Sequence, residues 1–149
     1  MRKFIVTVLF ILIASTCFCL DSRPQKIHNF LVAKFSDSPL IGHEQELVYC
    51  ADKFNLDYRL YLAISAAEST FGRSYRKSTN NLTGISNGVT KFDSIYDNIY
   101  KTNELISTGK WYWKYRKTRK LEDLVYVYKG VPPYKHYVFT LNWVFEQLK

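Results

Sequence analysis

The chain has 149 residues, of which 47% are hydrophobic and 17% aromatic, with 21 basic against 13 acidic residues. This length and composition fit one domain with a core of ordinary size, and they exclude a wholly disordered chain. Six glycines and four prolines exclude collagen-like and low-complexity architectures. No period of about 20–50 residues recurs, which excludes a solenoid.

The first 20 residues have the order of an export signal. Two basic residues precede the apolar run 4–14, and small residues and then polar residues follow it. This order is typical of a secretory signal peptide, and we place the cleavage near Cys19. Residues 4–20 just reach the minimum length of a membrane span, so an uncleaved anchor is one alternative. Lipid attachment at Cys17 or Cys19 is another.

The expected organisation is a signal peptide (residues 1–19), an irregular N-terminal lead-in (20–37) and one folded domain (38–149). Without the signal peptide the chain keeps 19 basic and 13 acidic residues, so its net charge is +6. A basic exported domain suits an anionic partner, such as a cell-wall polymer or a membrane surface. Only Cys50 remains, so an internal disulfide is excluded, and the absence of a Cys/His cluster in the sequence argues against a structural zinc site.

Apolar spacing predicts a mainly α-helical domain. Apolar residues recur at helical intervals in five segments. These lie over residues 44–55, between Asp57 and Gly72, from Ser94 to about residue 106, over 121–128 and from Tyr137 to the chain end. Asn87-Gly88, between short apolar runs, predicts one small two-stranded hairpin over about residues 82–92.

Glu68 is the most informative residue because it lies at the edge of an apolar helical stripe over residues 60–67. Apolar surroundings favour the protonated form of a carboxyl group, which can then donate a proton near neutral pH. The alternative is a structural role, for instance in a buried ion pair with Arg73 or Arg76.

Several segments in a fixed order carry a family resemblance. Glu68-Ser69-x-Phe71-Gly72 is followed by Asn80-Asn81-x-x-Gly84-Ile85, and Phe92-Asp93-Ser94-Ile95 then opens a helix. Together with Ser38-Pro39-Leu40 and Tyr128, they resemble the lysozyme-like superfamily, and within it lytic transglycosylase and glucosaminidase-type domains. The resemblance covers residues 30–149 and implies a mainly α, lysozyme-like α+β fold.

The resemblance implies that the protein cleaves the β-1,4 bond between N-acetylmuramic acid and N-acetylglucosamine in peptidoglycan, with Glu68 as general acid and then base. It places Ser69, Asn81, Gly84 and Tyr128 at the substrate. The residues alone also allow purely structural roles: Ser69 as a hydroxyl at a helix end, Asn81 and Gly84 as turn residues, and Tyr128 as a core aromatic. No cofactor or metal is expected, because acid–base glycan cleavage needs none. We expect a monomer.

A second carboxylate would decide between hydrolysis and transglycosylation. Asp93 and Asp97 are the nearest candidates, but a capping box at the start of a helix explains both. A mechanism with one glutamate is therefore favoured. Two departures from the family pattern concern substrate contacts: Gly84-Ile85-Ser86 replaces Gly-Leu-Met-Gln, and Thr83 replaces a bulky aromatic residue.

The segment 110–120 combines six basic and four aromatic residues. It could bind nucleic acid, but an exported protein argues against that partner. Alternatively, the segment could bind anionic wall polymers, with Trp111 and Trp113 stacked on sugar faces, or it could simply be a solvated basic surface.

Two alternative functions remain for the whole protein: a non-catalytic peptidoglycan-binding module, and an effector that attacks another cell's wall. The three histidines, His28, His43 and His136, are too scattered to predict a metal site.

Overall fold

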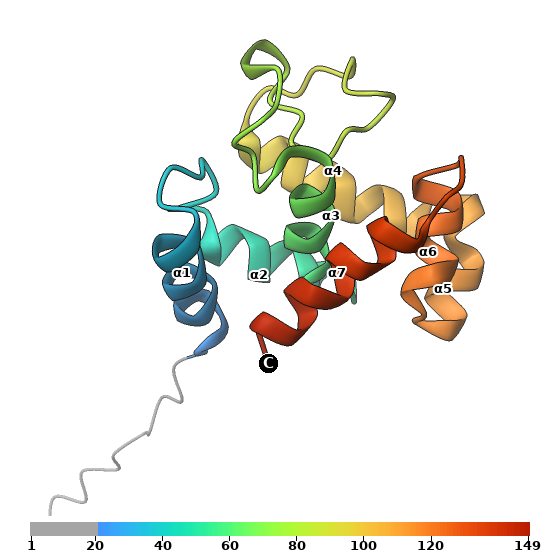
Figure 1. Cartoon of the computed structure of the whole chain (residues 1–149), viewed down its shortest axis with the longest axis horizontal. Helices are drawn as coiled ribbons and strands as arrows, with labels where there is room; N and C mark the ends of the chain where they lie inside the picture. The colour runs from blue at the N-terminus through green and yellow to red at the C-terminus, as the bar shows by residue number, and fades with distance from the viewer. Residues whose placement is uncertain (1–20) are drawn as a thin grey trace, which may run out of the picture.

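The computed structural model describes residues 21–149, in which α-helices are joined by loops and short 3-10 turns (Figure 1). The helices are α1 (Arg23–Lys34), α2 (Glu44–Lys53), α3 (Leu60–Ser69), α4 (Ile95–Thr108), α5 (Trp113–Thr118), α6 (Leu121–Tyr128) and α7 (Lys135–Gln147). Two 3-10 helices, η1 (Lys77–Thr79) and η2 (Lys110–Tyr112), precede α4 and α5. The predicted mainly α class is confirmed.

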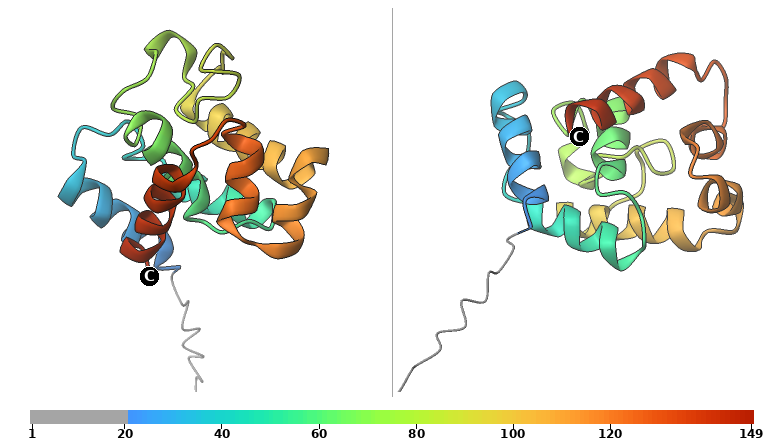
Figure 2. Two further views of the ribbon diagram at one scale, coloured as in Figure 1. Left: turned by 45° about the vertical axis from the view of Figure 1, so that its right-hand side comes forward. Right: turned by 90° about the horizontal axis from the view of Figure 1, so that it is seen from below.

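Helix α3 lies at the centre of the core. Residues 60–65 are buried on all sides, as expected for a helix that is apolar around its whole circumference. Helix α7 packs along α3, and α4 also contacts it; Figures 1 and 2 show α3 among the other helices. The helix ends because Thr70 and Phe71 adopt left-handed backbone angles. Glu68 therefore lies half-buried in the last turn of a helix whose first six residues are buried.

The N-terminal segment corrects one expectation, since residues 23–34 form helix α1 instead of an irregular lead-in. Ile27, Phe30 and Leu31 are buried, and their i, i+3, i+4 spacing places them on one face of this helix. Pro24 is compatible with the helix because it stands in the first turn, where its missing N–H costs no hydrogen bond.

The predicted hairpin is absent: residues 82–92 form turns and irregular loop, and no strand occurs in residues 21–149. Asn87 and the residue before it are both left-handed, and the Gly88 N–H donates to the Gly84 carbonyl (3.1 Å), which closes a helical turn. The Asn81 side chain donates to the carbonyls of Ile85 (2.9 Å) and Thr90 (3.1 Å). A side-chain amide thus takes the place of the cross-strand partners that a hairpin would have supplied.

The predicted start of helix α4 is confirmed, and a buried amide joins this helix to the loop before it. The Ser94 hydroxyl accepts a hydrogen bond from the Asp97 N–H (3.0 Å). One turn later, the fully buried Asn98 accepts hydrogen bonds from the Leu82 N–H (3.1 Å) and the Tyr61 hydroxyl (2.6 Å). Asn98 therefore fixes the loop against both α3 and α4.

In residues 21–149 we find no helix that combines the length and apolar character of a membrane span. The expected signal peptide and the alternative anchor over residues 4–20 lie outside the described part of the chain.

Candidate functional site

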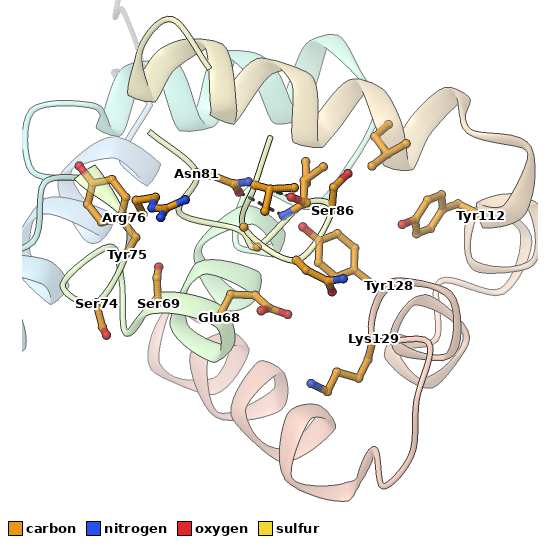
Figure 3. Close-up of a pocket in the computed structure, with 16 residues that line it drawn as sticks. Glu68, Ser69, Ser74, Tyr75, Arg76, Asn81, Ser86, Tyr112, Tyr128 and Lys129 are labelled. Atoms are coloured by element: carbon orange, nitrogen blue, oxygen red, sulfur yellow. Dashed lines mark hydrogen bonds between the residues drawn. The ribbon is translucent and has the colours of Figure 1, made fainter. Parts of the chain in front are cut away.

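A cleft of about 700 Å³ opens at the end of α3 (Figure 3). The loop between Ser74 and Val89 forms one side of it, and α4, η2 and α6 contribute Leu105, Tyr112 and Tyr128. Because this loop contains only one short 3-10 helix, η1, its shape depends on side-chain hydrogen bonds to the helices beneath it. The five site residues expected from the sequence all line this cleft: Glu68, Ser69, Asn81, Gly84 and Tyr128.

Glu68 is held from two sides. One carboxylate oxygen, Oε1, accepts a hydrogen bond from the Tyr137 hydroxyl of α7 (2.8 Å). Gly84 lies against the other side, since a Cβ atom placed on this glycine would be 2.5 Å from Glu68 Oε2. Gly84 also has a φ of +70°, a left-handed angle that favours glycine. Figure 3 shows the Glu68 side chain pointing into the cleft toward Tyr128 and Lys129.

Two phenols near Glu68, those of the buried Tyr137 and the half-buried Tyr128, act as hydrogen-bond donors. Burial raises the pKa of both Tyr137 and Tyr128 well above that of a free phenol, so both hydroxyls stay protonated at neutral and mildly alkaline pH. The Tyr128 hydroxyl donates to the Thr83 carbonyl (2.7 Å), which ties α6 to the loop. Tyr137 fixes the carboxylate, whereas Tyr128 fixes the loop that faces it.

The hydroxyl of Ser69 is occupied by backbone groups. It donates to the Leu82 carbonyl (2.6 Å) and accepts from the Gly72 N–H (2.9 Å). The Asn81 amide is likewise engaged with the loop backbone, and its Oδ1 accepts from the Ile85 N–H (3.1 Å). These contacts favour the structural alternative for both residues, in which they shape the wall of the cleft.

Glu68 is the one carboxylate among the described residues that line the cleft. Asp93 and Asp97 lie outside this lining and are joined by a hydrogen bond from the Asp93 N–H to Asp97 Oδ2 (3.2 Å). The ion pair considered for Glu68 is not formed among residues 21–149, because Arg73 pairs with Asp37 (2.7 Å). Glu68 therefore has no structural salt bridge in this part of the chain.

The other charged residues of the cleft are cationic. Arg76 and Lys129 are exposed and lie on different sides of Glu68 in Figure 3. The sequence indicated Arg76 only as a possible ion-pair partner of Glu68 and did not indicate Lys129, because isolated basic residues in loops have no pattern. It also placed Tyr137 in the core, where its ring does lie, and nothing in the spacing indicated that its hydroxyl meets Glu68.

No metal-binding cluster occurs in residues 21–149. His28 bonds Glu44 through Nδ1 (2.9 Å), and His43 bonds Glu46, in each case between neighbouring parts of the N-terminal half. His136 is exposed at the start of α7. Each histidine thus has the surface or packing environment expected from the sequence.

Comparisons with protein-family models, with curated proteins and with solved structures found no match to this chain.

Proposed function

We propose that the protein is an exported enzyme that cleaves the glycan strand of peptidoglycan, with Glu68 as general acid and base. The observation that carries this proposal is the position of a lone carboxylate in a large cleft, fixed by Tyr137 and by the backbone of Gly84. A positioned carboxyl group within reach of a bound glycosidic oxygen is the requirement for acid-catalysed cleavage. The resemblance to lytic transglycosylase and glucosaminidase-type domains supports the same assignment.

The reaction with one carboxyl group proceeds in two steps. Glu68 first donates its proton to the oxygen between N-acetylmuramic acid and N-acetylglucosamine, and the bond from that oxygen to C1 of the muramic acid breaks. The 6-hydroxyl of the same muramic acid then attacks C1 and gives its proton to the Glu68 carboxylate. The product is a 1,6-anhydro sugar, and the glutamic acid is regenerated. No second carboxylate is required, in agreement with the positions of Asp93 and Asp97 outside the cleft lining.

The charges around the cleft support an anionic glycan as substrate. Arg76 and Lys129 provide two exposed cations beside Glu68. Peptidoglycan carries carboxylates on its lactyl groups and peptides, whereas an unsubstituted N-acetylglucosamine polymer is neutral. A non-catalytic peptidoglycan-binding module would use the same cleft and is the second candidate.

The test is a digest of purified peptidoglycan by residues 20–149, with the products identified by mass spectrometry. Anhydro-muropeptides are expected. Products with reducing ends would keep the glycan-cleaving assignment but replace the transglycosylase route by hydrolysis. No soluble product, with the protein still sedimenting with the wall, would contradict catalysis and favour the binding module.

Tyr137→Phe tests the positioning of Glu68. Phenylalanine keeps the ring in its buried site but removes the donor to Glu68 Oε1. We expect kcat to fall about tenfold, with KM nearly unchanged, because misplacement of a reacting group affects the chemical step more than binding. A purely structural role for Tyr137 would instead lower the melting temperature and leave kcat of the folded protein unchanged.

A further inference from the structure

The net charge of the domain is concentrated in one part of the fold. Residues 110–129, which we term the α5–α6 lobe, contain seven basic and two acidic residues, a net charge of +5. Residues 21–149 as a whole carry 19 basic and 13 acidic residues, a net charge of +6. The rest of the described chain is therefore close to neutral. Helices α5 and α6 pack against each other and against η2 at one end of the molecule (Figures 1 and 2).

Part of this positive charge has no acidic or backbone partner among the described residues. Lys114 pairs with Asp123 (2.6 Å) within the lobe, and Arg116 and Arg119 donate to backbone carbonyls outside it, so these three side chains already have structural partners. The lysines left over are exposed and form no salt bridge within residues 21–149: Lys110, Lys117, Lys120 and Lys129. Exposed cations without partners favour binding to a polyanion.

Exposed aromatic rings accompany these lysines. Trp111 is 68% exposed and Trp113 is 60% exposed, although tryptophan is a residue that proteins ordinarily bury to a large extent. The Lys110 ammonium lies over the Trp111 ring, 4.6 Å from its centroid. Such rings offer flat faces on which sugars can stack, beside cations that can bind phosphate.

The spacing of the tryptophans favours a chain-like partner over a flat surface. Trp111 belongs to η2, and Trp113 opens α5. Two residues along a helix are separated by roughly 200–240° of rotation, so the two side chains leave the lobe in different directions. A membrane would need both rings on one face, whereas a flexible polymer can pass around the lobe and contact both.

We propose that the α5–α6 lobe binds a linear wall polymer whose sugar-bearing units are joined by phosphodiesters. The lysines contact its phosphates, and the tryptophans stack on its sugars. Because Tyr112 and Tyr128 of the lobe also line the cleft, a polymer bound here lies beside the catalytic site. The inference does not depend on glycan cleavage, since binding is measured on a polymer that has no bond for the cleft to cut.

The probe is a purified ribitol phosphate polymer that bears N-acetylglucosamine, titrated with residues 20–149 at several salt concentrations. The lobe variant combines Lys110→Gln, Lys117→Gln and Lys120→Gln. The matched control combines Lys26→Gln, Lys77→Gln and Lys91→Gln, which removes three exposed lysines elsewhere. We expect the lobe variant to bind at least about tenfold more weakly and with a smaller salt dependence, and the control to change by less than about twofold. Equal weakening in both variants would overturn the proposal, because overall charge would then suffice.

A second pair of measurements identifies the partner. Trp111→Ala combined with Trp113→Ala is expected to weaken binding to the sugar-bearing polymer but not to the same polymer without sugar. Single-stranded oligothymidylate with the same number of phosphates and vesicles of phosphatidylglycerol are the competing probes. Binding of either as tightly as the sugar-bearing polymer would overturn the assignment to a wall polymer. Melting temperatures of all variants confirm that each protein is folded.

Discussion

Glu68→Gln is expected to lower the rate of peptidoglycan cleavage by about 10²–10⁴-fold, the contribution typical of a general acid and base. Glutamine has nearly the same shape, and its amide oxygen can still accept the hydrogen bond from the Tyr137 hydroxyl. The variant cannot transfer a proton. Its fold and its sedimentation with peptidoglycan should therefore be unchanged while soluble products disappear.

The matched control for this experiment is Glu146→Gln, which makes the same chemical change on an exposed residue of α7 outside the cleft lining. It should retain full activity. A Glu68→Gln protein that still released products at the rate of the unmodified chain would refute the assignment of Glu68, whatever the products were. Both variants change the net charge by the same amount, so the ratio of their cleavage rates reports the contribution of the Glu68 carboxyl group alone.

Gly84→Ala is expected to cause the second-largest loss of activity, because the added methyl group meets the Glu68 carboxylate. The Cβ atom would lie 2.5 Å from Glu68 Oε2, and Glu68 can relieve this contact only by moving away from its bound position. Such a displacement should lower kcat at least about tenfold, since a small misplacement of a reacting group is costly. The left-handed angle adds about 1–2 kcal/mol of destabilisation.

Gly130→Ala separates these two effects. Gly130 has the same φ of +70°, but no atom lies within 4 Å of the position that its Cβ would occupy. The two variants should therefore lose a similar amount of stability in urea unfolding, while only Gly84→Ala loses activity. Equal activity in both would mean that Gly84 serves the loop conformation alone.

Helices α2, α3, α4, α6 and α7 could be predicted from the sequence because their signals are local, whereas α1 and α5 were not predicted. Burial of every third or fourth residue marks α2, α4, α6 and α7, and the Ser94 cap marks the start of α4. The loop before α4 could not be predicted in the same way. Its Asn-Gly pair favours a hairpin locally, but the buried Asn81 side chain satisfies the backbone groups that a strand partner would have used.

The candidate site was predictable where one residue broke a pattern, and not where the contact was between distant residues. Glu68 is conspicuous as an acidic residue beside an apolar stripe, and it lines the cleft. Tyr137 follows a helical stripe like any core aromatic, yet its hydroxyl crosses from α7 to the carboxylate. Such a contact between residues 69 positions apart depends on how α3 and α7 pack, which no local spacing encodes.

The single amide of Asn98 has a consequence for the motion of the cleft. Its Oδ1 accepts hydrogen bonds from the Leu82 N–H and the Tyr61 hydroxyl, and its Nδ2 donates to the Thr83 hydroxyl (3.0 Å). The Asn98 side chain is fully buried, so these bonds are shielded from solvent. Any opening that swings the loop outward must break these bonds together and leave a polar group stranded in the interior. The wall of the cleft and the first turns of α4 therefore form one cooperative unit, and we expect any opening of the cleft to be confined to the exposed tip near residues 86–89, with the base of the loop remaining closed.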